Sequence, residues 1–286
     1  MLFDTPVRLG VQIQPQHVQY SDIHDAVFRL EEMGVDILFN WDHFFPLYGD
    51  PDGDHFESWT MLAAWAEQTE RGEFVALVNC NSYRNANLQA DMARTVDHIS
   101  KKGGDTGRFI LGTGSGWFQR DYDEYGYDFG TAGSRLNALA SDLDRIVERW
   151  GKLNPAPTRK IPVMIGGKGE QKTLRIVARH ADIWHSFVTP DELQHKFGVF
   201  VKWAEAEQRD GGGAGPADEI AAFGQRPVIT GRQQQIFATL PAVRTGPAEI
   251  DDPAEPEIAE QAERVRRCLH HHRPFGEVDI ADEIDR

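Results

Sequence analysis

The sequence predicts an α/β fold, a TIM-type (β/α)8 barrel of parallel strands with a divergent C-terminal portion. Six short apolar segments alternate with amphipathic helical segments along about two-thirds of the chain, with short connections between them. Most of the apolar segments end in glycine or polar residues. A doubly wound open sheet also fits this alternation, but the regular spacing favours the barrel, in which the strand ends converge on one face.

The first three strand–helix units are expected before residue 105. Apolar segments predict strands at residues 7–13, 35–39 and 74–78. Ser21 caps the first helix and Gly34 ends it. The apolar faces of the three helices are predicted from Ile23, Val27 and Leu30, from Met61, Leu62 and Trp65, and from Leu88, Met92, Val96 and Ile99.

Three further units follow. Strands are predicted at residues 109–111, 161–165 and 181–184. A capping box at Thr189–Glu192, with Pro190 at the first helical position, begins the helix of the sixth unit. The other two helices are predicted from Leu136, Leu139, Leu143, Ile146, Val147 and Trp150, and from Leu174 and Val177.

The pattern weakens after residue 208, although we expect a single domain over residues 1–286. The later segments are Gly211–Pro216 as a flexible loop, Ile220–Phe223 and Val228–Thr230 as weak strand segments, Pro247–Pro256 as a poorly ordered acidic stretch and Ile258–Leu269 as a last helix. Six units are therefore predicted from clear patterns, and the last two of a barrel are not.

Composition and charge limit the class of protein. The chain has 45 acidic and 30 basic side chains, a net charge of −15, and no basic stripe that would attract a nucleic acid. No run reaches the roughly 20 apolar residues of a membrane span, and the first residues lack the features of a secretory signal. Cys80 and Cys268 do not make a disulfide framework, which favours the cytoplasm.

Glycines occupy alternate positions after the strand at residues 109–111, at Gly112, Gly114 and Gly116. Glycine permits positive φ and a close approach of the backbone to a ligand. In α/β enzymes, a strand followed by a glycine turn and a helix forms a floor for flat or phosphorylated cofactors. A tight connection without a ligand is the alternative, and this segment alone does not decide between them.

Asp42 and His43 follow a predicted buried strand, so a barrel would place both at its mouth. Imidazole titrates near neutral pH, and His43 can therefore accept a proton from an alcohol while a hydride leaves. The alternative is that both residues only hold neighbouring loops through hydrogen bonds.

Residues 166–172 precede a predicted helix whose free N–H groups can hold a phosphate. Lys168, Lys172 and Arg175 supply positive charge there, although a plain helix start is the alternative. The aromatic residues between Tyr122 and Phe129 are expected to pack a lid. No metal site is predicted, because the sequence His270-His271-His272 with Cys268 belongs to a solvated helix end.

Six segments of the chain resemble a known family: Asp42–Phe44, Ser58–Leu62, Arg108–Phe118, Tyr125–Phe129, Ile165–Gly167 and Ala178–Asp182. They are similar to the bacterial-luciferase-like superfamily, specifically its oxidoreductases that depend on the deazaflavin coenzyme F420. The resemblance covers roughly residues 7–205 and implies a TIM-type barrel that holds F420, often as a dimer.

The resemblance also implies positions for the cofactor. A non-proline cis peptide bond that supports the deazaflavin ring falls near Ala76–Leu77, within a residue or two. The ring is expected to contact Asp42, His43 and Asn79. The side chain of the cofactor is expected to run along Gly112, Thr113, Gly114 and Ser115. Its phosphate is expected to bind at Gly166, Gly167 and Lys168.

Two departures from the family disfavour a sugar-phosphate substrate. Ser115 stands where sugar-phosphate dehydrogenases carry an acidic residue, and Leu47 stands where they carry tryptophan. We therefore expect hydride transfer between C5 of F420 and a small organic substrate, with His43 as acid–base and Asp42 as its orienting partner. An FMN-dependent monooxygenase on the same barrel, and an F420-binding carrier without turnover, are the alternatives.

Overall fold

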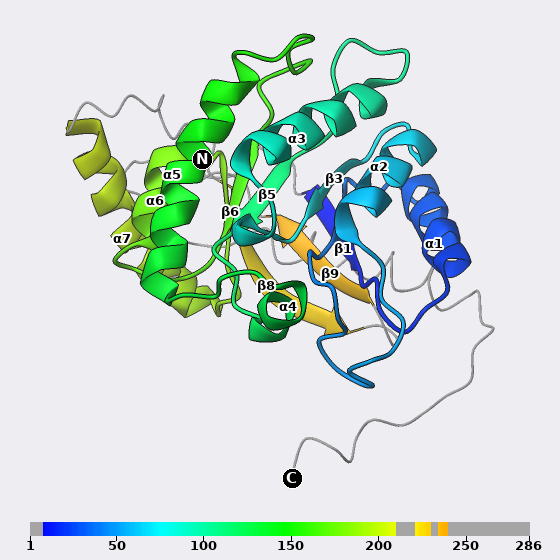
Figure 1. Ribbon diagram of the computed structural model, residues 1–286, viewed down its shortest axis with the longest axis horizontal. Coiled ribbons are helices and arrows are strands. Elements are labelled where there is room, and N and C mark those ends of the chain that lie inside the picture. Colours follow the sequence, from blue (N-terminus) through cyan, green and yellow to red (C-terminus); the bar gives the residue numbers. More distant parts are fainter. Residues whose placement is uncertain (1–7, 210–220, 230–233, 240–286) are drawn as a thin grey trace. The chain divides into compact units, whose positions relative to one another are not determined.

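The computed structural model describes residues 8–209, 221–229 and 234–239. The predicted alternation of strands and helices is confirmed within these residues (Figure 1). The strands are β1 (Arg8–Ile13), β2 (Ile37–Asn40), β3 (Glu73–Ala76), β4 (Asn79–Cys80), β5 (Leu111–Gly114), β6 (Val163–Gly166), β7 (Ile183–His185), β8 (Ala221–Ile229) and β9 (Gln234–Thr239). The helices are α1 (Tyr20–Glu32), α2 (Ser58–Gln68), the 3-10 helix η1 (Asn81–Tyr83), α3 (Ala86–Lys101), α4 (Gln119–Tyr125), α5 (Ala132–Trp150), α6 (Thr173–His180) and α7 (Pro190–Arg209).

The nine strands of the described residues form one sheet in the order β3-β2-β1-β9-β8-β7-β6-β5-β4. The two strands at the ends of this order, β3 and β4, are separated in the chain by Leu77 and Val78 alone. Phe74 of β3 also bonds to the segment that leads into β5, accepting from Ile110 N (3.1 Å) and donating to Arg108 O (3.3 Å). The strand order thus returns to the stretch where it began, as in a (β/α)8-type barrel.

The last strand departs from the predicted parallel arrangement. β1 to β8 pair in parallel wherever they are neighbours, but β9 runs antiparallel to both β8 and β1. Figure 1 shows β9, drawn in orange, beside the blue β1. Only four residues, 230–233, connect β8 to β9, and a parallel crossover needs a dozen or more. The two weak strand segments around residues 221–223 and 228–229 are both part of β8, while β9 carried no recognised signal.

Several predictions fall on parts of the chain that the structure does not describe. They are the loop at residues 211–216, the acidic stretch at 247–256, the helix at 258–269 and the cluster of Cys268 with three histidines.

Two of the three glycines after the fourth predicted strand lie in the strand itself, and the third lies just beyond its end. Gly112 and Gly114 belong to β5, and Gly116 has a positive φ of 80°. A Cβ on Gly112 would stand 2.1 Å from the carbonyl oxygen of Ala76, so this glycine lets β5 approach β3. The reason for Gly112 is therefore backbone packing inside the sheet.

The helices bury mostly the faces that their periodicity predicted, with one exception. In α1 the buried side chains are Ile23, Val27 and Leu30, as expected. In α3 the buried face carries small and polar residues, and Leu88 is 52% exposed. Small side chains such as Ala90 and Ala93 allow close packing, and the buried Asp97 accepts hydrogen bonds from Thr158. The period of α3 was thus read correctly, but its phase was wrong.

Arg108 fixes the segment that precedes β5. Its guanidinium donates to the carbonyl oxygens of Ser100, Ala66, Thr69 and Gly72, and to the hydroxyl of Thr69. These acceptors lie at the ends of α2 and α3 and at the start of β3, so one side chain joins three elements below the barrel.

Candidate functional site

The residues expected to share a site lie at one end of the sheet. Cys80 pairs with Gly114 across β4 and β5, and its backbone N–H donates to Asp42 Oδ2 (3.0 Å). A Cβ on Gly114 would stand 3.6 Å from the carbonyl oxygen of Gly166 at the end of β6. Gly167 N then donates to the carbonyl oxygen of His185 at the end of β7 (3.0 Å). The carboxyl ends of β2, β4, β5, β6 and β7 are thus linked by direct contacts.

Two glycines face Val78 at this end. A Cβ on Gly114 would stand 2.8 Å from Val78 Cγ2, and one on Gly166 would stand 3.0 Å from Val78 Cγ1. The peptide bond between Leu77 and Val78 is cis, one bond beyond the expected position and within its stated range. The residues of β5 and β6 that face Val78 are therefore glycines, and the main chain there carries no side chains. We call this flat surface, formed by Gly114 and Gly166 around Val78, the glycine floor.

His43 is held at this end by a carboxylate. Its Nδ1 lies 2.8 Å from Asp121 Oδ2, and its side chain is 12% exposed. The imidazole makes edge-on contacts with the rings of Trp117 (5.6 Å) and Phe118 (5.4 Å). Both rings come from the segment between β5 and α4. His43 therefore has one nitrogen bonded to an acid and aromatic walls around its ring.

Asp42 does not have the role predicted for it. Arg84 donates to both of its carboxylate oxygens (2.6 and 2.9 Å), and Cys80 N–H bonds one of them as well. Arg84 also pairs with Glu57 (2.8 Å), whose carboxylate caps the start of α2. The orienting partner of His43 is Asp121, and Asp42 instead ties the end of β2 to the loops around it.

Two further expected cofactor contacts, Asn79 at the ring and Thr113 along the cofactor side chain, face the helices. Phe109 packs against Trp59 of α2, so the side of the sheet that carries Phe109 and, four residues later, Thr113 is the helix side. Asn79 is in register with Thr113 and projects to the same side. The oxygen and nitrogen of the Asn79 amide and the Thr113 hydroxyl are buried without a hydrogen-bond partner among the described residues. A cofactor at the strand ends would meet the main chain of these two residues.

Ala76, Leu77 and Ser115 complete the expected cofactor contacts. Ala76 is fully buried beneath Gly112, and Leu77 N donates to the carbonyl oxygen of Asn40 in β2 (2.8 Å). The carbonyl oxygen of Ser115 accepts from the hydroxyl of Tyr122 (3.4 Å). These three residues thus support the floor mainly through their backbone.

The expected phosphate end lies between β6 and α6. Gly167 has a φ of 137°, and Lys168 is exposed. Lys172 donates to the side chain of Asn137 in α5 (3.0 Å). Arg175 instead pairs with Glu207 of α7 (2.6 Å), so its charge is already compensated. Of the predicted cations, Lys168 and Lys172 remain beside the glycines.

Three residues of the site carried no recognised signal: Asp121, Tyr83 and Arg84. Asp121 stands 78 positions from His43, and Arg84 stands 42 positions from Asp42. The aromatic residues around Asp121 were recognised, and the structure packs them together with Phe44 and Tyr83. Asp123, Glu124 and Asp128 stand in the same segment, so the sequence does not single out Asp121 among its acids.

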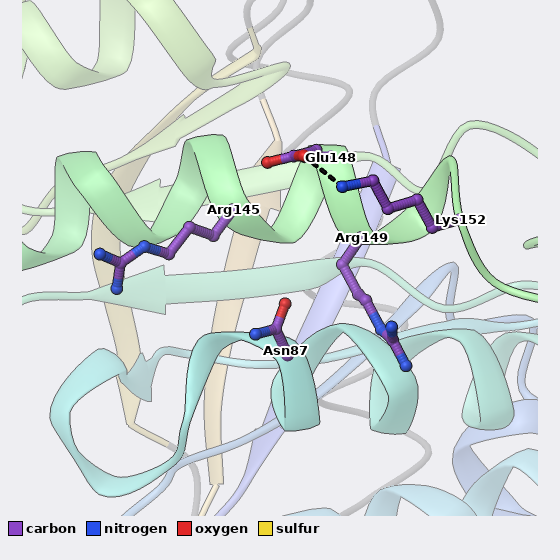
Figure 2. Close-up of a pocket in the computed structure, with 5 residues that line it drawn as sticks. All are labelled: Asn87, Arg145, Glu148, Arg149 and Lys152. Carbon is purple, nitrogen blue, oxygen red and sulfur yellow. Dashed lines mark hydrogen bonds and ion pairs between the residues drawn. The ribbon is translucent and has the colours of Figure 1, made fainter.

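A pocket of about 470 Å³ lies away from the strand ends, between α3 and the end of α5. Figure 2 shows its lining, with Arg145, Glu148 and Arg149 from α5, Lys152 beyond it and Asn87 from α3. Its cations are each paired with an acid: Arg145 with Asp142, Arg149 with Asp91, and Lys152 with Glu148. This pocket therefore holds little uncompensated charge.

Among the described residues, no three histidine, cysteine or acidic side chains lie close enough together to hold a metal ion. Within the same residues, no helix has the length and apolar character required to cross a membrane.

One buried and one half-buried histidine predict acid sensitivity. Burial lowers the pKa of His185 and of His55 to about 4, and His185 is 3% exposed. An unfolded histidine titrates near pH 6.5, so below that pH the unfolded chain binds protons that the folded chain does not. The free energy of unfolding should therefore fall as the pH drops from about 6.5 to about 4, with His185 contributing about 2–3 kcal/mol.

Urea unfolding at pH 7 and at pH 4.5 measures this loss. His185→Gln should reduce the difference between the two pH values, whereas His24→Gln, whose side chain is 56% exposed, should leave it unchanged. A His185→Gln protein with the same pH dependence as the wild type would contradict the assignment.

The fold and the residues at its strand ends define the class of TIM-type barrel enzymes, in which active sites lie at the carboxyl ends of the strands. The model of one family, the luciferase-like monooxygenases, matches residues 2–235, and the chain belongs to this family. No curated protein sequence matches the chain.

Solved structures with the same fold use either of two cofactors. An F420-dependent secondary alcohol dehydrogenase in complex with an F420-acetone adduct has a TM-score of 0.64 at 17% identity, over 76% of this chain and 68% of that one. The coenzyme F420-dependent tetrahydromethanopterin reductase of Methanopyrus kandleri has a TM-score of 0.57 at 16% identity, over 71% and 62%.

The oxygenating constituent of 3,6-diketocamphane monooxygenase from Pseudomonas putida, in complex with FMN, has a TM-score of 0.57 at 13% identity, over 71% and 63%. The chain thus spans less than two-thirds of the length of the second and third of these structures. At such identities the likeness shows the fold alone, and a flavin or deazaflavin is the cofactor class that these structures share.

Proposed function

We propose that this protein is an F420-dependent oxidoreductase that transfers a hydride between the deazaflavin and a small organic substrate. The proposal rests on the position of His43, which is bonded to the buried Asp121 and lies at the same strand ends as the glycine floor. Secondary alcohols are the first substrate class to test, because a structural neighbour is an F420-dependent secondary alcohol dehydrogenase.

The residues at the strand ends fit a flat tricyclic ring. Gly114 and Gly166 leave no side chain between the main chain and Val78, and a Cβ on either would already press on Val78. Lys168, Lys172 and the glycines before α6 would hold a phosphate, as at other helix starts. When bound, F420 supplies the hydride acceptor or donor at C5.

The chain's own residues supply the proton chemistry and the enclosure. His43 would take the proton of a substrate hydroxyl, or return it in the reverse direction. The rings of Trp117 and Phe118 cover much of His43, whose side chain is 12% exposed, and so limit its contact with water. A homodimer, expected from the family resemblance, stays a prediction.

Titration with F420 and with FMN, followed by the fluorescence of each cofactor, tests the proposal first. We expect F420 to bind and FMN to bind more weakly. Addition of propan-2-ol to the F420 complex should then bleach the deazaflavin absorbance. FMN binding without F420 binding would favour the monooxygenase alternative, and F420 binding with no bleaching by a panel of small alcohols would favour the carrier.

A matched pair of variants tests the floor. Gly114→Ala places a methyl group against Val78 and should weaken F420 binding about tenfold, because the floor must shift by several tenths of an ångström. Gly103→Ala, where a Cβ meets nothing within 4 Å, should bind like the wild type. Equal affinities in the two variants would place the ring elsewhere.

A further inference from the structure

Two hydrogen-bond donors and the imidazole of His43 converge on the carboxylate of Asp121, which is completely buried. His43 Nδ1 and the hydroxyl of Tyr83 each lie 2.8 Å from Oδ2. The backbone N–H of Phe44 donates to Oδ1 (3.1 Å). His43 and Phe44 belong to the segment after β2, Tyr83 belongs to η1, and Asp121 belongs to α4. Three separate segments of the chain thus meet at one acid.

Two partners of Asp121 can only donate to it: the backbone N–H of Phe44 and the hydroxyl of Tyr83. A backbone N–H can only donate. Burial and the neighbouring Cys80 and Asp121 raise the pKa of Tyr83, so its phenol keeps the proton that it donates. With these two bonds in place, the carboxylate is left as an acceptor for His43 as well.

We propose that Asp121 is the positioning residue that fixes the tautomer of His43, with the proton on Nδ1 and the lone pair on Nε2. A carboxylate that accepts from Nδ1 requires a proton there, and a neutral imidazole carries only one. Nε2 has no hydrogen-bond partner among the described residues and is therefore the nitrogen available to a substrate.

The catalytic consequence rests on the proposed function. In alcohol oxidation, Nε2 of His43 would take the hydroxyl proton, and a bound deazaflavin would supply the acceptor for the hydride from the same carbon. The imidazolium that forms carries its second proton on Nδ1, opposite Asp121, which stabilises the new positive charge. Carbonyl reduction is the reverse, with Nε2 returning the proton.

Nitrogen-15 NMR of the cofactor-free protein tests the tautomer without any turnover. The signals of His43 are assigned by their loss in His43→Gln. In the wild type, the Nδ1 signal should be that of a protonated nitrogen and the Nε2 signal that of an unprotonated one. Asp121→Asn should reverse this pattern, because its amide can donate to Nδ1.

Kinetics provide the second measurement. Asp121→Asn should lower kcat by a factor of about 100 or more, with little change in KM or in F420 affinity. Tyr83→Phe removes one donor but keeps the ring packed against Phe44, so the tautomer should be retained and kcat should fall less than about tenfold. Asp123→Asn, on the exposed side of α4, is the matched control and should behave like the wild type.

The outcomes separate this inference from the proposed function. A wild-type His43 with its proton on Nε2, or an Asp121→Asn protein with an unchanged tautomer, would overturn the inference even if F420 is turned over. The expected tautomers without F420 turnover would support the inference as a property of His43 and reject the proposed function. A folded Asp121→Asn protein with reversed tautomer and unchanged kcat would overturn the positioning role.

Discussion

His43→Gln should abolish most of the turnover with F420 and an alcohol, with kcat lower by a factor of about 100 to 10,000. Glutamine keeps a polar side chain of similar reach, but it cannot take a proton near neutral pH. The aromatic walls of Trp117 and Phe118 do not depend on the imidazole proton, so F420 affinity should change little. Steady-state kinetics together with an F420 titration separate the two effects.

The control for this variant is His24→Gln, since His24 is exposed on α1 and pairs only with Asp25. Its kcat and F420 affinity should match those of the wild type. Unchanged turnover in His43→Gln would reject His43 as the acid–base. Loss of F420 binding in the same variant would instead assign His43 to holding the cofactor.

Arg84→Met should destabilise the protein by about 3–5 kcal/mol, because it leaves the buried carboxylate of Asp42 without its cation. The ion pair is bidentate, Asp42 is 1% exposed and the Arg84 side chain is 9% exposed. Burial alone would lower the pKa of Arg84, but Asp42 and Glu57 outweigh it and raise that pKa. Urea unfolding at pH 7 measures the loss.

Two further variants make this result specific. Arg145→Met removes a cation that is 63% exposed, and its cost should stay below about 1 kcal/mol. The double variant Asp42→Asn with Arg84→Met should recover part of the stability, because no buried charge is left unpaired. If Arg84→Met is as stable as Arg145→Met, Asp42 is not held as the structure indicates.

Periodicity was sufficient to predict the barrel, because six apolar segments and their helices each carry a local signal. The same signal does not show how far a strand extends through glycines, so β5 was expected to end where it begins. It also gave the wrong face of α3, where alanine and bonded polar residues replace large apolar ones. The direction of β9 depends on a four-residue connection and not on any pattern within the strand.

The site was predictable only as far as the chain places residues at strand ends. His43, Gly114 and Gly166 are such residues, and the structure brings their strand ends together. Which acid bonds His43 depends on the loop between β5 and α4, and adjacency along the chain favoured Asp42 over Asp121. The direction of the Asn79 side chain could not be predicted from the sequence either, because it depends on the register between β4 and β5.

One short stretch, Trp117 to Asp121, does two things at once for His43. It supplies the rings that shelter the imidazole and the acid that determines where its proton sits. If this stretch swings aside to admit a substrate, the base loses its cover and its preferred protonation together. Substrate entry would then be coupled to the protonation of His43, whose Nε2 would be ready to accept a proton only while the stretch covers it.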